Sequence, residues 1–370
     1  MNPRIAYCTN VHAGETLATT IAQLERHATA VRAALGLTEP LGIGLWLSAA
    51  ALEELATNDD ARRLRDRLAA LGLAVRTFNG FPYGNFHHER VKHDVYEPHW
   101  ARPERYRYTR RLAELAPDLV PQGTAHVSIS TLPLGWRQAF SNEGCGASVG
   151  LAAAQLTTLA GDLARVEAAR GVRVTVDLEP EPGCLLDRSE HVVDLFEQCF
   201  RDEVSRRHLG VCHDVCHAAV MFERQAEVLA AYRKAGIGVH KVQVSAAVEA
   251  DGSEASLEAL ASFVEPRYLH QTCVASRGAV QLFEDLPLAL AARPRGTWRT
   301  HFHVPIFQTS IGPLRATQAE ILECLAALGG DTPTLEVETY AWNVLPSALQ
   351  PVSLASGIAQ EVRWLAERVP

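Results

Sequence analysis

The sequence predicts an α/β fold, a (β/α)8 barrel, on two observations. Short runs of β-branched and aromatic residues alternate with longer segments, rich in Ala, Leu, Glu and Arg, that have helical periodicity, which is the pattern of repeated βα units. Several of the short runs end in a carboxylate, a histidine or an amide. Because the carboxyl ends of the strands of a closed parallel barrel lie on one face, these side chains would converge where such barrels build their active sites.

Nine segments have the character of strands, one more than a barrel needs. They are 4–10, 41–47, 74–80, 126–131, 173–179, 209–215, 238–245, 300–307 and 334–340. The stretch from Ala246 to Trp298 is too long for an ordinary crossover between parallel strands. We therefore assign 238–245 and 334–340 as the seventh and eighth strands. An insertion of about residues 246–299 then leads to His301-Phe302-His303, which we place over the mouth of the barrel.

Segments of helical periodicity fill most of the gaps between these strands. They are 14–35, 49–71, 102–116, 150–170, 188–207, 217–235, 257–263, 317–328 and 353–368. A second insertion, about residues 82–125, follows the third strand and carries His87, His88, His93, Tyr96, His99 and Trp100. We expect it to form a lid, since long loops in compact domains are usually functional or disordered. The chain, 1–370, is then a single barrel domain with two insertions.

The composition limits the kind of partner that we expect. Hydrophobic residues make up 47% of the 370 residues and charged residues 21%, as in a soluble globular protein with an ample core. A formal net charge of −8 and a pI near 6.0 give no support to a nucleic-acid or anionic-membrane surface, so we expect a small-molecule substrate. No apolar stretch approaches the roughly 18 residues of a membrane span, and the N-terminal residues lack the apolar region of a signal peptide. We expect a cytoplasmic protein that is not integral to a membrane.

The eight cysteines are too few for a disulfide scaffold in a chain of this length. Those in apolar runs, Cys8, Cys199, Cys273 and Cys324, are expected to be buried free thiols. Cys212 and Cys216 are separated by three residues that include a histidine and an aspartate, which leaves a thiolate metal site open as an alternative.

Three carboxylates stand at the ends of predicted strands: Glu179 on the fifth, Asp214 on the sixth and Glu338 on the eighth. In one barrel mouth they would repel and raise one another's pKa unless a cation neutralised them. Oxygen-rich coordination with one or two imidazoles suits Mn²⁺, Zn²⁺, Co²⁺ or Mg²⁺, and the sequence does not separate these. A structural alternative stays open for Asp214 and His217, because a strand-to-helix junction is also where an aspartate caps a helix.

Polar and aromatic residues at the ends of the first three strands are expected to line a pocket for a small molecule. They are Asn10, His12, Trp46, Asn79 and Phe81. Trp46 could instead pack between layers of the barrel. Arg277, in the second insertion, could reach a substrate oxygen or be a surface charge. The sequence has no evident phosphate-binding loop, which favours an unphosphorylated substrate.

The strand-end residues Glu179, Asp214-Val-Cys-His217 and Glu338 resemble those of the xylose-isomerase-like TIM barrel superfamily, which includes sugar isomerases, 3-epimerases and endonuclease IV. The resemblance implies one divalent metal ion held by Glu179, Asp214 and Glu338. It also implies that the two glutamates exchange a proton next to a substrate carbonyl, while His217 contacts a substrate oxygen.

The seventh strand departs from this superfamily pattern. Epimerases have a histidine ligand there, whereas this chain has Gln243 at the best-aligned position and His240 three residues earlier. His303 could complete the set of ligands instead, because His301-Phe-His303 echoes a ligand pair that the endonuclease branch places between its seventh and eighth strands.

Four further segments resemble the EboE-type metabolite traffic proteins. They are Tyr7-Cys-Thr-Asn-Val-His-Ala-Gly-Glu15, Pro266-Arg-Tyr-Leu-His-Gln-Thr272, His301-Phe-His-Val-Pro305 and Glu336-Val-Glu-Thr-Tyr340. This resemblance implies membrane-associated pathway partners and specifies no reaction.

Three functional hypotheses follow from these observations. The first is a metal-dependent isomerase or epimerase acting on a small sugar-like or polyol-like metabolite, and the second is an EboE-type binding protein without isomerase activity. The third, a phosphodiesterase of the endonuclease type, would need histidines on the third and fourth strands, where Asn79 and Ser128 or Ser130 stand.

Overall fold

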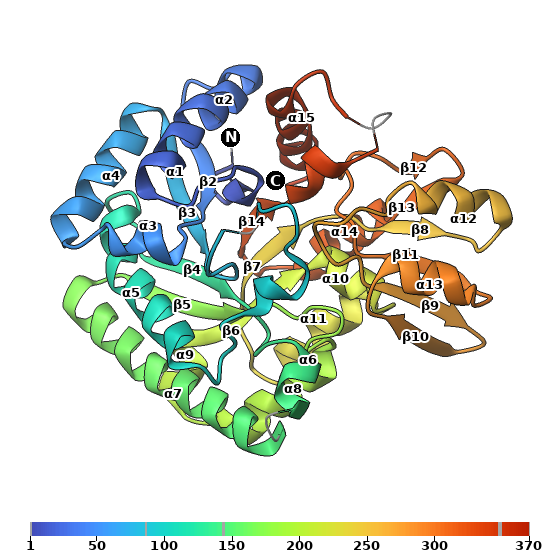
Figure 1. The fold of residues 1–370 in the computed structure, drawn as a ribbon. Coiled ribbons are helices and arrows are strands. Elements are labelled where there is room, and N and C mark those ends of the chain that lie inside the picture. Colours follow the sequence, from blue (N-terminus) through green and yellow to red (C-terminus); the bar gives the residue numbers. More distant parts are fainter. Residues whose placement is uncertain (1, 86, 143–144, 347–349, 370) are drawn as a thin grey trace.

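The computed structural model describes residues 2–85, 87–142, 145–346 and 350–369. Eight parallel strands close into a barrel in the order β1-β14-β7-β6-β5-β4-β3-β2 (Figure 1). They are β1 (Ile5–Cys8), β2 (Leu41–Leu45), β3 (Leu73–Asn79), β4 (His126–Thr131), β5 (Arg173–Leu178), β6 (Leu209–Asp214), β7 (Val239–Val244) and β14 (Thr334–Val337). The predicted (β/α)8 barrel is confirmed, and its strands fall at the eight segments assigned from the sequence.

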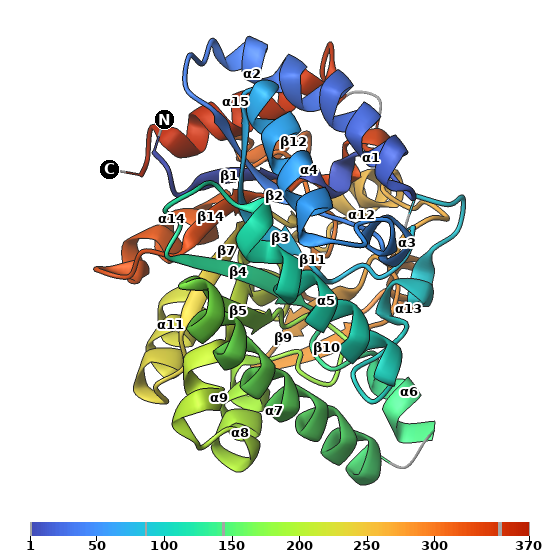
Figure 2. The same ribbon diagram turned by 90° about the vertical axis from the view of Figure 1, so that its left-hand side faces the viewer.

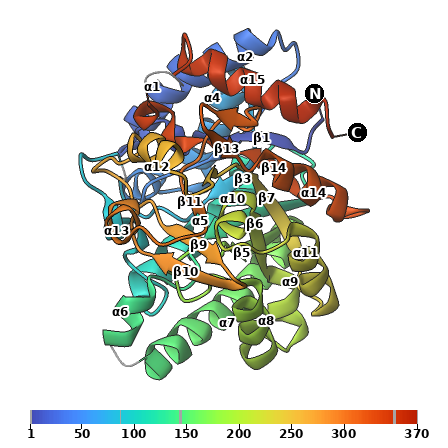
Figure 3. The ribbon, with the colours of Figure 1, turned by 90° about the vertical axis from the view of Figure 1, so that its right-hand side faces the viewer.

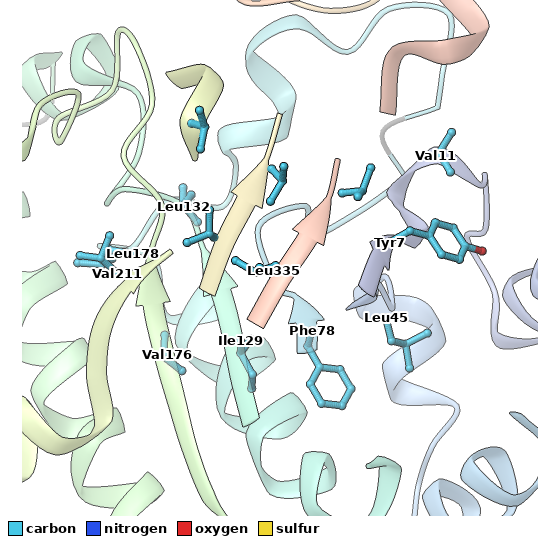
Figure 4. Close-up of a cluster of buried hydrophobic side chains, with 14 of the residues drawn as sticks. Tyr7, Val11, Leu45, Phe78, Ile129, Leu132, Val176, Leu178, Val211 and Leu335 are labelled. Carbon is cyan, nitrogen blue, oxygen red and sulfur yellow. The ribbon is translucent and has the colours of Figure 1, made fainter. Parts of the chain in front are cut away.

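Successive side chains of a strand point to opposite sides of the barrel wall. Phe78 and Ile129 belong to the buried apolar cluster of the barrel strands that Figure 4 shows. Their neighbours along the strands, Asn79 and Ser130, are equally buried, and the Ser130 hydroxyl donates to Asn79 Oδ1 at 3.4 Å. The apolar core therefore lies between the barrel and its helices, while the interior of the barrel contains polar groups that hydrogen-bond to one another.

Helices cover the outside of the barrel (Figures 1 and 2). They are α1 (Leu17–Gln23), α2 (Thr29–Leu35), α3 (Ala49–Glu53), α4 (Asn58–Ala70), α5 (Pro103–Leu119), α6 (Arg137–Asn142), α7 (Cys145–Arg170), α8 (Ser189–Cys199), α9 (Glu203–His208), α10 (Val215–Val220), α11 (Gln225–Lys234), α14 (Gln318–Leu328) and α15 (Leu354–Ala366). A π-helical turn, η2 (Leu24–Ala28), joins α1 to α2, and short 3₁₀ helices are η1 (Thr9–Val11), η3 (Lys92–Tyr96) and η4 (Tyr340–Val344). None of the described helices combines the length and apolar character needed to cross a bilayer.

Helix α4 shows how the local sequence produces these elements. Thr57 caps its first turn, since the threonine hydroxyl accepts a hydrogen bond from Asp60 N at 3.2 Å. Ala61, Leu64 and Leu68 then recur at helical spacing and are all buried. The remaining face of α4 is charged, so the helix can only pack with this stripe against the barrel.

Between β7 and α14 the chain forms a second, antiparallel sheet beside the barrel (Figure 3). Its strands are β8 (Val248–Ala250), β9 (Thr272–Ser276), β10 (Ala279–Phe283), β11 (Thr297–Thr300), β12 (Ser310–Ile311) and β13 (Leu314–Ala316), in the order β10-β9-β11-β8-β13-β12. Helices α12 (Glu254–Ala261) and α13 (Leu286–Ala292) pack on it. Helix α12 overlaps the helical segment predicted at 257–263, whereas most of the strands of this insertion were not predicted, because strands of two to five residues are too short to show a clear alternation in the sequence.

The segment that follows β3 lies at the mouth of the barrel. Residues 82–102 contain η3, and α5 after them is an ordinary barrel helix, so only the first half of the predicted 82–125 insertion is irregular. The backbone amides of Val91 and Lys92 donate to Arg267 O at 2.8 and 2.9 Å, and Lys92 Nζ lies 2.6 Å from Asp285 Oδ2. This mouth segment, residues 82–102, is therefore fastened to the connections of the second sheet, which fits the predicted lid.

Candidate functional site

The carboxyl ends of three barrel strands bring three carboxylates together. Glu179 directly follows β5, Asp214 ends β6 and Glu338 directly follows β14. All three are buried, and their oxygens lie within 4.8 Å of one another. The structure thus assembles, at the barrel mouth, the three residues that the sequence predicts as the main ligands of a cation. We refer to them as the carboxylate set.

Charge repulsion and burial perturb this carboxylate set. Burial, followed by the negative charge of Asp214, raises the pKa of Glu179 to about 7. Burial and the charges of Glu179 and Asp214 raise the pKa of Glu338 well above its usual range. For Asp214 burial also opposes ionisation, but His217, His303 and hydrogen bonds outweigh it, so its pKa is lowered. In the absence of a cation the set retains protons near neutral pH; a divalent cation would remove this repulsion.

Three imidazoles converge beside the carboxylates: His217 at the start of α10, and His301 and His303 just after β11. The Nδ1 atoms lie 2.8 Å from carbonyl-type oxygens, His217 from Pro180 O, His301 from Gln271 Oε1 and His303 from Glu338 O. Because these oxygens only accept hydrogen bonds, each Nδ1 is a protonated nitrogen, and in the neutral rings Nε2 carries the lone pair. Burial opposes protonation of His217, but the charges of Asp214, Glu181 and Glu179 outweigh it and raise the pKa of this ring. We refer to His217, His301 and His303 as the imidazole set.

The contacts between these Nε2 atoms are too close for neutral acceptors. His301 Nε2 lies 3.2 Å from Nε2 of both His217 and His303. Two lone pairs at this distance need a proton or a metal ion between them, and one proton could satisfy only one of the two contacts. Burial and the neighbouring imidazoles hold the pKa of His301 well below its usual range, and burial lowers that of His303 to about 4. The raised pKa of His217 allows a proton in its own contact with His301, which leaves the contact between His301 and His303 without one. The arrangement fits a cation bound by all three nitrogens.

Asp214 connects the two sets. Its oxygens lie within 4.8 Å of donor nitrogens of His217 and His303 as well as of the other two carboxylates. Oδ1 accepts from His217 N at 2.9 Å and from Ser245 Oγ at 2.8 Å, while the buried Oδ2 has no hydrogen-bond partner among the described residues. Asp214 therefore caps α10 and still has an oxygen to offer to a cation. The structural and the functional interpretation of this residue are compatible.

The two seventh-strand candidates lie at different places. Gln243 is buried and is the register partner of Asp214 on β6 and of Glu336 on β14; its Nε2 donates to Asn79 Oδ1 at 3.2 Å, and its Oε1 has no partner among the described residues. That oxygen is free to act as a ligand. His240 instead lies 2.7 Å from Asp177 Oδ1 and lines a separate cavity with His126 and Arg173, near the start of the barrel strands. It is remote from the mouth, so it cannot complete the carboxylate set.

A buried ion pair underlies the site. Lys241 and Glu336 are fully buried and paired, and Lys241 Nζ also donates to Asn79 Oδ1 at 2.7 Å. The Glu336 carboxylate reaches across to β2, where a Cβ on Gly44 would collide with it. The structure pairs Glu336 on β14 with Lys241 on the neighbouring strand β7, two residues before Gln243, which is the register partner of Glu336.

A second network, not foreseen from the sequence, supports the imidazole set. Besides accepting from His301, Gln271 donates from Nε2 to Glu181 Oε1 at 3.0 Å and to Tyr96 OH at 2.9 Å. Tyr96 in turn donates to Glu181 at 2.6 Å. Glu181 is buried, and an oxygen of it lies within 4.8 Å of donors of His217 and His301. Gln271 thus fixes both the ring of His301 and the nearby carboxylate.

The pocket above these groups contains some of the predicted substrate-binding residues. Asn10, Asn79 and Phe81 line it. Trp46 lies behind the wall, where its Nε1 donates to Pro82 O at 3.1 Å. His12 is buried against Tyr7 and His27, and the structure does not place it on the pocket wall.

Arg277 lies outside the pocket, whereas Cys216 lies beside the imidazole set. Arg277 is exposed in the turn between β9 and β10, away from the pocket, so the prediction that it reaches a substrate does not fit its place. Cys216 is near His301 and His303, but burial and then the charges of Asp214 and Glu338 raise its pKa well above the usual range. A bound metal ion would itself deprotonate such a thiol, so the thiolate alternative stays open for Cys216.

A closed parallel barrel with carboxylates and imidazoles at its carboxyl-terminal mouth defines a class of barrel suited to binding a cation and a small molecule. No family model matches the chain, and no curated protein matches its sequence. A solved D-tagatose 3-epimerase-like protein superposes with a TM-score of 0.54 at 13% identity, over 98% of this chain and 96% of that one.

A second solved structure gives the same result. A xylose isomerase-like TIM barrel protein from Mycobacterium smegmatis, in complex with magnesium, superposes with a TM-score of 0.50 at 12% identity, over 98% of this chain and 95% of that one. The chain therefore has the fold of the xylose isomerase-like TIM barrels. The EboE resemblance is not tested by these comparisons.

Proposed function

We propose that this protein is a metal-dependent isomerase or epimerase that acts on a small sugar-like or polyol-like metabolite. The observation that carries the proposal is the convergence of Glu179, Asp214 and Glu338 at the barrel mouth, with raised pKa values for both glutamates. The structural likeness to a D-tagatose 3-epimerase-like protein and to a barrel solved with magnesium supports it.

The carboxylate set fits a divalent cation. It offers three negative oxygens, and the unpartnered Oε1 of Gln243 and Oδ2 of Asp214 are buried acceptors that lack donors among the described residues. When bound there, a divalent ion supplies Lewis-acid polarisation of a substrate carbonyl. Glu179 takes a proton from the carbon next to that carbonyl, and Glu338 returns one to it. A carboxyl with a pKa near neutrality is suited to such a transfer.

The imidazole set fits a second cation. Its three nitrogens favour Zn²⁺ or Co²⁺, whereas the oxygen-rich carboxylate set suits Mg²⁺ or Mn²⁺ as well. Asp214 would be shared between the two. We assign His217 to this imidazole set, because its Nε2 is directed at His301. His303, predicted as a possible ligand with the carboxylates, would serve the same second cation.

Elemental analysis of the purified protein tests the proposal. The wild type is compared with Asp214→Ala, with a Glu179→Gln and Glu338→Gln double variant, and with a matched double variant of exposed carboxylates, Glu227→Gln and Glu254→Gln. We expect metal in the wild type and the surface variant, and a lower metal content in both site variants, because each loses ligands of the carboxylate set. Proton exchange between solvent deuterium and a panel of ketoses then tests the reaction.

Two outcomes would change the assignment. If neither wild type nor variants take up metal after addition of Mn²⁺, Co²⁺, Zn²⁺ or Mg²⁺, the mouth is a binding pocket only, and the isomerase proposal fails. If metal is retained but no ligand exchanges a proton, the alternative of an EboE-type binding protein is favoured. The glutamine in place of the epimerase histidine on β7 supports that alternative. The cytoplasmic location, the single domain and pathway partners at a membrane remain predictions from the sequence.

A further inference from the structure

The pocket above the proposed metal centre has two chemically different halves. Its floor consists of the carboxylates, imidazoles and amides described above. Its outer wall is apolar and largely aromatic, formed by Phe81, Val95, Tyr96, Tyr268, Leu269 and Tyr340. The wall therefore combines side chains from the mouth segment, from the connection that precedes β9 and from η4.

The aromatic side chains of this wall pack in edge contacts. The ring centroids of Tyr268 and Tyr340 are 5.2 Å apart, those of Phe81 and Tyr96 are 6.1 Å apart, and that of Tyr340 is 4.8 Å from His303. Such contacts hold the rings in place, so the wall presents a preformed apolar surface directly beside the imidazole set. A free sugar, which carries a hydroxyl on almost every carbon, would leave much of this surface without a complementary partner.

One cation lines the pocket in the described part of the chain, and its charge is already compensated. Lys92 Nζ lies 2.6 Å from Asp285 Oδ2 and donates to Tyr268 O at 2.6 Å. Below the floor, Lys241 is paired with Glu336. Neither ammonium group is available to a phosphate or carboxylate of a substrate.

The charge of the floor leads to the same conclusion. Four carboxylates approach the donor sets: Glu179, Glu181, Asp214 and Glu338. Their four negative charges would equal the charge of two divalent cations and exceed that of one. The site with its cations bound therefore has no excess positive charge. A substrate that carries its own negative charge would gain little here.

Tyr340 offers a polar contact at the boundary between the halves. Its ring contacts His303 and Tyr268, and its hydroxyl makes no hydrogen bond within the described part of the chain. A ligand that spans both halves could satisfy this hydroxyl.

We propose that the substrate is an uncharged hydroxycarbonyl or polyol compound that carries an apolar group, with its oxygens at the donor sets and its apolar group against Val95, Tyr268 and Leu269. This inference rests on the proposed function and narrows it, because it predicts a hydrophobic substituent where a simple sugar has none. The sequence missed this half of the pocket, since most of its residues come from segments between the barrel strands.

Three small α-hydroxyketones test the inference without any choice of sugar stereochemistry. Hydroxyacetone has only the polar head, 2-hydroxyacetophenone has a phenyl group in place of the methyl group, and dihydroxyacetone phosphate adds a phosphate dianion while it keeps the free α-hydroxyl. Their dissociation constants for the metal-loaded, full-length protein are measured by ligand-observed NMR titration. We expect 2-hydroxyacetophenone to bind at least about 10-fold more tightly than hydroxyacetone, as burial of a phenyl group predicts, and the phosphate to bind no more tightly than hydroxyacetone.

Two matched variants locate the effect. Leu269→Asn should reduce the preference for the phenyl compound several-fold, whereas Leu151→Asn, at an exposed position on α7, should leave it unchanged. Should Leu269→Asn fail to fold, Val95→Thr, which keeps the size and adds a hydroxyl, replaces it. A preference for the phosphate, equal binding of hydroxyacetone and its phenyl analogue, or no binding of any of the three would overturn the inference.

Metal analysis of the same samples separates the two levels of the proposal. Metal present without a phenyl preference removes only the substrate class. Metal absent, with the phenyl preference intact, removes the metal-dependent reaction and leaves the amphipathic ligand class standing.

Discussion

Replacement of Glu179 by glutamine should stabilise the metal-free protein and abolish metal binding at the carboxylate set. The amide keeps the shape of the side chain and removes one charge from a buried cluster of three carboxylates. Burial and the Asp214 charge raise the pKa of Glu179 from 4.5 to about 7. A group whose pKa is raised on folding favours the folded state below its unfolded pKa, and this contribution is lost as the pH rises through the folded pKa.

The structure gives the size of this effect. Ionising Glu179 in the folded protein costs about 3 kcal/mol at pH 8, and about 2 kcal/mol of this arises between pH 5.5 and pH 8. Glu338, whose pKa is raised partly by Glu179, changes in the same direction. In the metal-free state at pH 8, Glu179→Gln should therefore be more stable than the wild type by up to about 3 kcal/mol.

Urea unfolding with a chelator, at pH 5.5 and pH 8, measures this directly. The variant should lose less stability than the wild type over this interval, whereas the exposed control Glu227→Gln should follow the wild type. Added Mg²⁺, which suits the carboxylate set rather than the imidazole set, should stabilise the wild type and the control but have little effect on Glu179→Gln. A metal-free variant that is less stable than the wild type at pH 8 would refute the argument, since it would show that the charge of Glu179 is compensated within the chain.

Three further predictions concern groups around the site. Gln271→Leu removes the acceptor that orients His301, so it should weaken binding of Co²⁺ at the imidazole set by roughly 10- to 100-fold and change the visible spectrum of bound Co²⁺. Gln271→Glu should restore part of the affinity, and an unchanged spectrum in Gln271→Leu would rule out this positioning role. Lys241→Met leaves the Glu336 carboxylate buried and unpaired, so it should lower the free energy of unfolding by about 3–5 kcal/mol. Adding Glu336→Leu should recover most of this loss, and no recovery would mean that packing, rather than charge, is the cause. Burial raises the pKa of Glu361 to about 7 despite three hydrogen bonds to it, so its contribution to stability is present below pH 4.5 and lost as the pH rises through 7. Between pH 5.5 and pH 8 the free energy of unfolding of Glu361→Gln should therefore fall by about 2 kcal/mol less than that of the wild type. An identical pH dependence in the variant would contradict the burial argument.

The sequence indicates the convergence of those residues whose place depends on strand order alone. Glu179, Asp214 and Glu338 each stand where a strand ends, and a closed barrel brings such ends together whatever the details of the register. The fold class was predictable for the same reason, since the alternation of strands and helices needs no knowledge of tertiary contacts. Where the prediction required the direction of a side chain, as for His12 and Trp46, a position near a strand end was not sufficient.

The residues that the sequence missed depend on contacts between distant segments. Lys241 has no local feature that distinguishes it from a surface lysine; it becomes an interior ion-pair partner because β7 lies beside β14 in the closed barrel, where its side chain meets Glu336. Gln271 and Tyr96 belong to segments without helical or strand periodicity in the sequence, and they meet only because the mouth segment docks on the connections of the second sheet. No pattern within one segment could indicate these pairings.

The second sheet explains why the two donor sets differ in chemistry. The barrel strands supply the carboxylates. In the inserted sheet, Gln271 directly precedes β9, and His301 and His303 come just after the end of β11. His301 N donates to Gln271 O at 2.8 Å, so the ligand and the residue that orients it are also joined through the backbone. The imidazole set thus depends on correct docking of the inserted sheet, and the carboxylate set depends on closure of the barrel. Since Asp214 is common to both, loss of the second sheet's contacts would leave a site that binds hard cations such as Mg²⁺ but has lost its preference for Zn²⁺ or Co²⁺.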